Sequence, residues 1–475
     1  MAERRSIFVN VSALAAGQMI AMALGFVTHA ILARAVGPAD YGVLGFAAAI
    51  ISYFGIAASL GTDTWAGREI AARRSDVRRI AEMILGLRLL LAILSVVGVV
   101  AFIPIWRPST LVSYMLLIQS VSLLAGALTV DFAFQGIERL DAVARRQVLT
   151  AVIALAGITA ALNLGGGIVA ASSMLQAAAV ISTLVMLWEF ARIAGYPRLS
   201  LTARAECLRV LHEAAPLAIT GLITTVYIYI DIVMLGFLRP GTEVGHYVAS
   251  TRVLAIGLVV ATILRTAVLP VLSRLQSSPT ERSEVGSHHA RVVASAGGLA
   301  GAGGFVLAPE ILEIIFGVEF REAASALRIL MVCLLFMNAV EVFHTQLVAW
   351  RLQNQQMWIM FAGAIFNIVL NIFLIPRYGI EGAAFATLAS TILILGLAGV
   401  VLTRHGFEIH ALPMGSAIGV ALILGALGRW IDIPIDGVLT KFLVVGAGLT
   451  IIYSAIVVAV GIVRPSETLR YFTRI

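Results

Sequence analysis

The chain has 475 residues, of which 60% are hydrophobic and 12% charged, and its mean hydropathy is +0.99. Water-soluble domains carry about 25% charged residues, so this composition excludes a soluble globular enzyme and predicts a polytopic membrane protein. The formal net charge of +7 does not indicate nucleic-acid binding, because the basic residues are spread through short loops rather than clustered on one polar face.

Apolar runs of about 20 to 28 residues, separated by short polar turns, predict about fourteen membrane spans. The first apolar run is too long for a typical signal peptide and is expected to be retained. Cys207 and Cys333 form neither a metal motif nor a disulfide framework. The expected spans are 8–33, 42–65, 80–104, 110–136, 145–164, 167–192, 212–238, 246–272, 290–316, 323–350, 355–376, 380–403, 411–431 and 437–463.

Basic residues predict the orientation of these spans, because cytoplasmic loops carry an excess of arginine and lysine. The chain has 33 basic residues, and Lys441 is the single lysine. Assigning alternate loops to alternate sides places 22 of them on one side and 7 on the other. The remaining four, Arg88, Arg252, Arg265 and Arg328, lie inside expected spans. Both termini are therefore predicted to be cytoplasmic.

A weak internal repeat indicates the domain organisation. ILARAVGPADYG near the start and IVMLGFLRPGTEVG in the middle share an apolar hairpin with a Gly/Pro-rich turn, at an offset of roughly 200 residues. The expected fold is an all-α polytopic membrane protein with two parallel-repeat bundles around a central cavity. Residues 1–200 would form the first bundle of about six spans and 201–404 the second, while 405–475 would add two spans.

Motifs for catalysis are absent from the sequence. It contains no GxxxxGK[ST] phosphate loop, no HExxH and no CxxC. A lipid-linked sugar polymerase would need a sizeable outward loop, and ATP-driven transport would need a nucleotide-binding domain; neither is present. We therefore expect no enzyme, no catalytic residue, no metal site and no resident cofactor.

Polar side chains recur at helical spacing inside several expected spans. Such faces usually point into a bundle or a water-filled path, and the alternative is hydrogen bonding between helices. The stripes comprise Gln18, Met22, Gly25 and His29 in the first span, Thr224, Tyr227 and Asp231 in the seventh, Asn338, Glu341, His344 and Thr345 in the tenth, and Asn367 and Asn371 in the eleventh.

Arginines inside spans suggest anion binding, because a guanidinium is permanently charged and matches phosphate oxygens bidentately. Arg88, Arg252 and Arg265 are the candidates for this role. The alternative for Arg252 and Arg265 is that their side chains reach the nearer membrane surface. Arg328 lies nearer a span end and is expected to be structural. A cluster of glycines between residues 297 and 304 is expected to pack helices closely.

Several motifs, in their order along the chain, resemble those of the oligosaccharide-lipid flippases called Wzx or polysaccharide biosynthesis proteins. This family lies in the MOP superfamily, which also holds MATE multidrug exporters and the lipid II flippase. The resemblance rests on LARAVGPADYG at 32–42, GIAASLG at 55–61, FQGIERL at 134–140, DIVMLGFLRPGTEVGHYVASTRVL at 231–254, IIFGVEFREAASALRIL at 314–330 and NIVLNIFLIPRYGIEGAAFATLAS at 367–390.

The resemblance implies translocation of a polyprenyl-diphosphate-linked oligosaccharide, such as an O-antigen, capsule or exopolysaccharide repeat unit, across the bacterial plasma membrane by alternating access. Arg88, Arg252 and Arg265 would then hold the diphosphate. Asp231, with Glu341 and His344 as a second candidate site, would bind a coupling proton or sodium ion. Membrane lipid, a polysaccharide polymerase and glycosyltransferases are the implied partners. The alternatives are a MATE-like ion-coupled exporter of drugs or metabolites and a non-transporting scaffold.

Overall fold

All regular elements of the described residues are helices in the computed structural model, which describes residues 2–198, 204–275, 278–430 and 436–463. In hydrocarbon each backbone N–H and C=O must be paired internally, and an α-helix achieves this within one segment. The all-α prediction is thus confirmed. The helices are α1 (Ala2–Ser59), α2 (Thr62–Ala72), α3 (Val77–Trp106), α4 (Thr110–Ala127), α5 (Asp131–Gly136), α6 (Leu140–Asn163), α7 (Gly167–Ala194), α8 (Arg204–Leu238), α9 (Gly241–Gly257), α10 (Val259–Arg274), α11 (Pro279–Val306), α12 (Ala308–Phe316), α13 (Ala324–Ala349), α14 (Gln353–Arg404), α15 (Ala411–Trp430) and α16 (Val438–Ala459), with 3₁₀ turns η1 (Arg74–Asp76) and η3 (Val318–Ala323).

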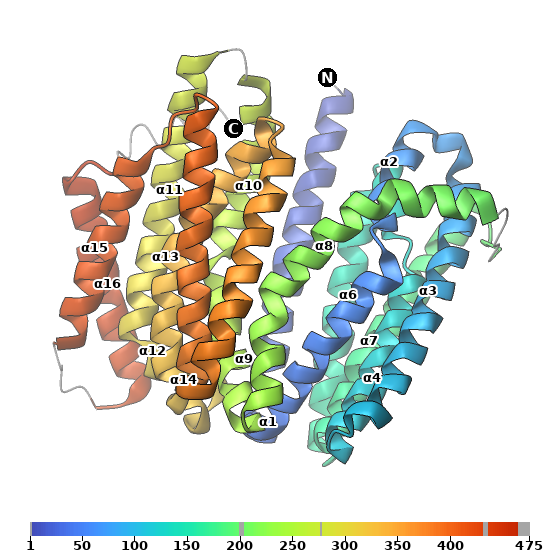
Figure 1. Ribbon diagram of the computed structural model, residues 1–475, viewed down its shortest axis with the longest axis horizontal. Coiled ribbons are helices and arrows are strands. Elements are labelled where there is room, and N and C mark those ends of the chain that lie inside the picture. The colour runs from blue at the N-terminus through green and yellow to red at the C-terminus, as the bar shows by residue number, and fades with distance from the viewer. Residues whose placement is uncertain (1, 199–203, 276–277, 431–435, 464–475) are drawn as a thin grey trace. The chain divides into compact units, whose positions relative to one another are not determined.

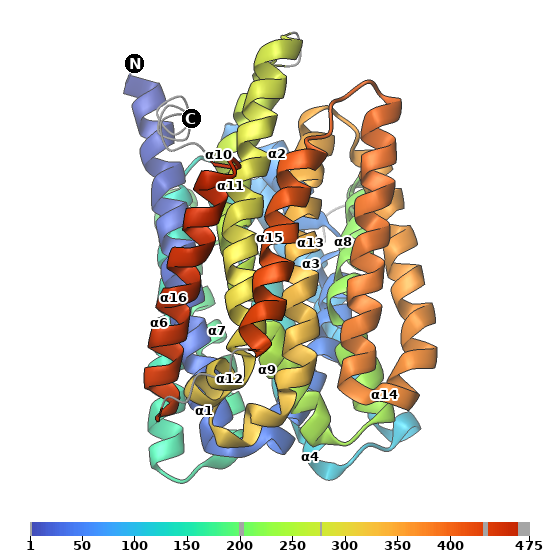
Figure 2. The same ribbon diagram turned by 90° about the vertical axis from the view of Figure 1, so that its left-hand side faces the viewer.

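Two compact units make up the chain, Met1–Val233 and Met234–Ile475. The first holds α1 to α7 and most of α8, and the second holds α9 to α16. Within the second unit α11 packs against α13, α15 and α16, as both views show (Figures 1 and 2). The predicted boundary between residues 200 and 201 falls in 199–203, outside the described residues.

Large apolar side chains lie on the outside of the helices as well as in the core. On α3, Leu94 is 58% exposed and Val97 57% exposed, whereas Ile84 of the same helix is fully buried. Water-soluble monomers rarely expose contiguous apolar faces of this kind. These surfaces fit a hydrocarbon solvent, so the chain is a multi-pass membrane protein.

Two helices are far longer than a bilayer is thick. At 1.5 Å per residue, the 58 residues of α1 would extend about 87 Å, against a hydrocarbon layer of about 30 Å. Both α1 and α14 are broken by a glycine with positive φ, Gly37 at 76° and Gly379 at 55°. Figure 1 shows each as two arms running in opposite directions.

The number of membrane crossings was predicted as about fourteen. In the described part of the chain, eleven helices are long and apolar enough to cross, or twelve when the α11–α12 pair, bent by 83°, counts as one span. This tally treats α1 and α14 as single helices. Fourteen spans therefore stays a prediction. The breaks at Gly37 and Gly379 are compatible with it, because each divides one long helix into two arms.

The glycines between residues 297 and 304 pack α11 against its neighbours, as predicted. A Cβ atom at Gly297 would lie 2.6 Å from Asn338, one at Gly301 would lie 2.4 Å from Leu335, and one at Gly304 would lie 2.3 Å from Met331. All three contacts are with α13. Because no Cβ is present, the two helix backbones approach closely along this seam.

Gly61 separates α1 from α2 and contacts α8. Its φ is 73°, and a Cβ there would lie 2.8 Å from the backbone nitrogen of Ala218. We expect Gly61→Ala to lower stability by about 1–3 kcal/mol, because the new methyl meets backbone and the left-handed conformation disfavours alanine. The apparent unfolding temperature in detergent measures this. Gly303→Ala is the matched control, since no atom lies within 4 Å of its Cβ position, and an equal loss in both variants would contradict the prediction.

Candidate functional site

Arg88, on α3 of the first unit, is a deeply buried predicted site residue, at 4% exposure. Its Nη1 lies 2.7 Å from Oδ1 of Asp63, at the start of α2, and donates to the Thr129 carbonyl at 3.3 Å. Its Nη2 donates to the Gly126 carbonyl at 2.5 Å. The last carbonyls of a helix have no partner within the helix, so Arg88 stabilises the end of α4.

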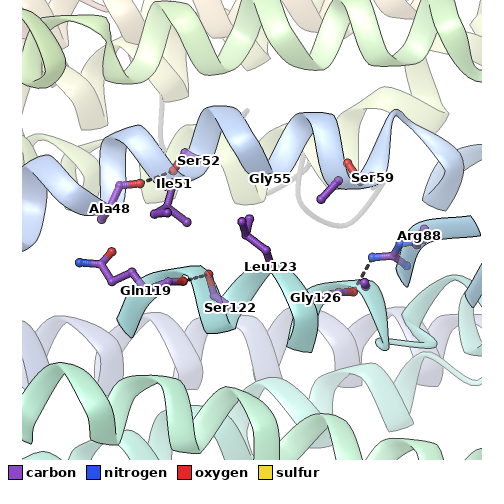
Figure 3. A pocket seen from close by; sticks show the side chains of 12 residues that line it. Ala48, Ile51, Ser52, Gly55, Ser59, Arg88, Gln119, Ser122, Leu123 and Gly126 are labelled. Carbon is purple, nitrogen blue, oxygen red and sulfur yellow. Dashed lines mark hydrogen bonds between the residues drawn. The ribbon is translucent and has the colours of Figure 1, made fainter. Parts of the chain in front are cut away.

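A cavity of about 330 Å³ lies beside Arg88 within the first unit. One wall is the second arm of α1 and the other is α4, and both are lined mainly by small or polar residues. Figure 3 shows Ile51 of α1 and Leu123 of α4 between the two helices, with the Arg88 guanidinium at one end beside Gly126. A phosphate entering this cavity would have to compete with Asp63 and two carbonyls for the donors of Arg88.

The polar stripe predicted on the first span does share one face. Gln18, Met22, Gly25 and His29 line a cavity of about 530 Å³ between α1 and α6. Arg146 of α6 lines the same cavity, and its Nε donates to Oδ1 of Asp131 at 2.7 Å. Polar groups and one arginine paired with a carboxylate therefore share this space with apolar side chains such as Met22 and Leu175.

Arg265 and Glu341 meet in the second unit, although they were predicted for different roles. Nη1 of Arg265 on α10 lies 3.2 Å from Oε2 of Glu341 on α13, and the side chains are 36% and 27% exposed. His344 lies one helical turn from Glu341 and is buried at 6% exposure. Its Nε2 has no hydrogen-bond partner among the described residues. An arginine, a carboxylate and an imidazole thus form one group inside a membrane-spanning bundle.

Arg252 and Asp231 are the other two predicted site residues. Arg252 is exposed on α9, and no residue in the described ranges pairs with it. Asp231 is 4% exposed on α8 in the first unit, within electrostatic range of Tyr53. Asn367 and Asn371 bond to each other at 2.9 Å, which is the helix-stabilising alternative for this stripe. Within the second unit, the structure therefore brings together three of the six predicted residues, Arg265, Glu341 and His344.

Asp63 is the functional candidate that sequence reasoning missed. It lies at the end of an expected span, beside the polar stretch that follows, so its position alone does not mark it as a partner of a buried charge. The weak signal is that Arg88 lies inside a span and needs an anion nearby. Two helix breaks, at Leu60–Gly61 and Leu128–Val130, bring Asp63 and the end of α4 to the same guanidinium.

Two protein families match the chain. The family described as polysaccharide biosynthesis protein matches residues 7–276, and the family described as lipid II flippase MurJ matches residues 147–445. Each match covers more than half of the 475 residues.

Two relatives come from Haloferax volcanii. A probable low-salt glycan biosynthesis flippase is 25% identical over 248 residues, which are 49% of this chain and 52% of the relative. The probable flippase AglR is 31% identical over 202 residues, which are 41% of each chain. The chain thus spans about half, or less, of the length of these curated relatives.

A solved structure of the lipid II flippase MurJ, in an inward closed conformation, has a similar fold. Its TM-score is 0.75 at 15% identity, with 93% of this chain and 98% of that chain covered. At this identity the likeness shows the fold alone.

Proposed function

Because the chain belongs to the polysaccharide biosynthesis protein family of MOP-superfamily flippases, we propose that it flips a polyprenyl-diphosphate-linked oligosaccharide across the plasma membrane. The polyprenyl diphosphate would carry an O-antigen, capsule or exopolysaccharide repeat unit. The proposal is of a transporter rather than an enzyme. The excess of basic residues on one set of loops supports cytoplasmic termini.

The observation that carries the proposal is the ion pair between Arg265 and Glu341. A guanidinium inside a membrane bundle requires an anion, and a diphosphate is a better bidentate acceptor than one carboxylate. Diphosphate and Glu341 would therefore compete for Arg265. When Glu341 takes up a proton, its carboxyl loses its charge and releases the guanidinium. Substrate capture and protonation are coupled through this single contact.

Arg252 is the second proposed ligand of the diphosphate, because its donors are not used by other described side chains. Removing one charge-assisted contact to phosphate costs about 1.5–3 kcal/mol, or about ten- to a hundredfold in affinity. We expect Arg252→Ala to weaken binding of purified protein to undecaprenyl diphosphate by that factor. A complementation assay in a strain lacking its own flippase should show reduced surface glycan.

Arg377→Ala is the matched control, since Arg377 is also exposed and lies on another helix, α14. It should retain both binding and complementation. Unchanged affinity in Arg252→Ala, with the protein folded, would contradict the assignment of Arg252. Full complementation by an Arg252→Ala, Arg265→Ala double variant would contradict the proposed diphosphate site as a whole.

A further inference from the structure

Buried polar atoms without a partner gather at the end of α13 in the second unit. Both ring nitrogens of His289, on α11, are fully buried and have no hydrogen-bond partner in the described part of the chain. The same is true of Oε1 of Gln346 and Nε2 of His344, both on α13. His289 and Gln346 are each 1% exposed. Native proteins leave few such groups unpaired, and ordered water or a functional role usually explains them.

An apolar cluster fixes where three helices meet. Val268 and Leu272 of α10 pack with Ala349 of α13, and Val285 of α11 packs against them. One helical turn from this cluster, α11 places His289 and α13 places Thr345. The same step along α10 leads from Val268 to Arg265, the partner of Glu341.

Thr345 lies on α13 between the apolar cluster and the Arg265–Glu341 ion pair. Its hydroxyl donates to the backbone carbonyl of Glu341 at 2.7 Å, so the two residues are stacked on one face of α13. The junction of α10, α11 and α13 next to the apolar cluster therefore holds His289, Thr345, Arg265 and Glu341.

Gly286 of α11 has no side chain, and two polar side chains from other segments lie near its Cβ position. A Cβ at Gly286 would lie 3.1 Å from Nε2 of His410 and 3.4 Å from Nε2 of Gln346. His410 and Gln346 therefore both approach the place where α11 has no side chain, one turn from His289. His410 lies between α14 and α15 and is only partly buried. Burial lowers the pKa of His410, and Arg291 adds to this while Glu408 opposes it, so the imidazole is mostly neutral at pH 7 and can accept a proton.

We propose that ordered water joins His410, Gln346 and His289 into a route that carries protons to Glu341. The inference rests on the proposed function and deepens it, because it makes the proton the coupling ion. Each imidazole takes a proton on one ring nitrogen and releases one from the other, while Gln346 and Thr345 only hold water. One proton enters at His410 and one ends on the Glu341 carboxylate, while each imidazole keeps its proton count and changes to its other tautomer.

The composition of the junction favours a proton over a metal ion. No group of three or more His, Cys, Asp or Glu residues that could hold a metal occurs in the described ranges. Imidazole and amide groups with unpaired atoms suit water, which needs two to four polar partners. Ionisable groups on the surrounding elements include Arg265 and Arg274 on α10, Glu281, Arg282, Glu284, His288, His289 and Arg291 on α11, Glu341 and His344 on α13, and His405, Glu408 and His410 after α14.

The test separates the rate of proton uptake from its amount. Purified full-length protein in weakly buffered detergent would be mixed with undecaprenyl diphosphate, and a pH indicator would follow proton uptake by stopped flow. We expect His289→Phe to slow uptake by about tenfold or more, because the apolar ring displaces the water that relays protons. The total uptake and the affinity for undecaprenyl diphosphate should be unchanged. His405→Phe, at an exposed histidine after α14, is the control and should keep the wild-type rate.

His289→Gln keeps polarity and volume but cannot relay a proton through a ring, so it should also slow uptake and serves if the Phe variant does not fold. A wild-type rate with normal amplitude in the folded variants would overturn the route. Glu341→Gln distinguishes a failure of the proton route from a failure of the proposed Arg265–Glu341 switch, since it should abolish the total proton uptake. If Glu341→Gln retains the full amplitude, the proposed switch fails regardless of how His289 variants behave.

Discussion

Asp63→Asn is expected to destabilise the first unit by about 3 kcal/mol, because it removes the ion-pair partner of the buried Arg88 guanidinium. Arg88 is only 4% exposed, and its remaining acceptors, the carbonyls of Gly126 and Thr129 and the Thr129 hydroxyl, are uncharged. Thermal unfolding in detergent, followed by circular dichroism, measures the loss. Asp40→Asn is the control on the same unit and should change stability by less than about 0.5 kcal/mol.

A double variant separates the structural role of Arg88 from substrate binding. Replacing both partners by apolar groups, as in Asp63→Leu with Arg88→Met, removes the unpaired charge and should recover part of the stability. If the double variant folds and restores surface glycan in the complementation assay, Arg88 does not hold the diphosphate. If the stability loss of the double variant equals the sum of the losses in Asp63→Leu and Arg88→Met, the ion pair contributes no coupling energy and the expected destabilisation is wrong.

Glu341→Gln is expected to tighten binding of undecaprenyl diphosphate by about tenfold, equal to about 1.4 kcal/mol, while abolishing transport. The neutral amide no longer holds Arg265, which lies 3.2 Å from the carboxylate in the wild-type protein. Binding by microscale thermophoresis and complementation of a flippase-deficient strain give the two readouts. A tighter complex that does not turn over is what loss of the competing anion predicts.

Arg265→Ala distinguishes this competition from a general loss of structure. It should weaken binding and abolish transport, and adding Glu341→Gln to it should not restore affinity. Glu322→Gln, at an exposed carboxylate, is the matched control and should behave as wild type. An unchanged affinity in folded Glu341→Gln would contradict the proposed competition between carboxylate and diphosphate.

Hydropathy and helical periodicity accounted for much of the fold. Both depend on neighbours within about one or two turns, so they predict that a segment is a membrane helix and which residues share its face. The shared face of Gln18 and His29 on α1 is confirmed, and so is the close packing of α11 at Gly297 and Gly301. Helix breaks are harder to predict, because the close approach of Gly61 to α8 is a contact between segments far apart in the sequence.

The candidate site was only partly predictable for the same reason. Sequence alone determined that this chain is a membrane protein with ionised groups in its spans, since composition and order suffice for that. Tertiary structure decided that Arg265 meets Glu341, 76 residues away, and that Arg88 meets Asp63. Charge pairing depends on distances of a few ångströms between different helices, and helical spacing constrains only one helix at a time.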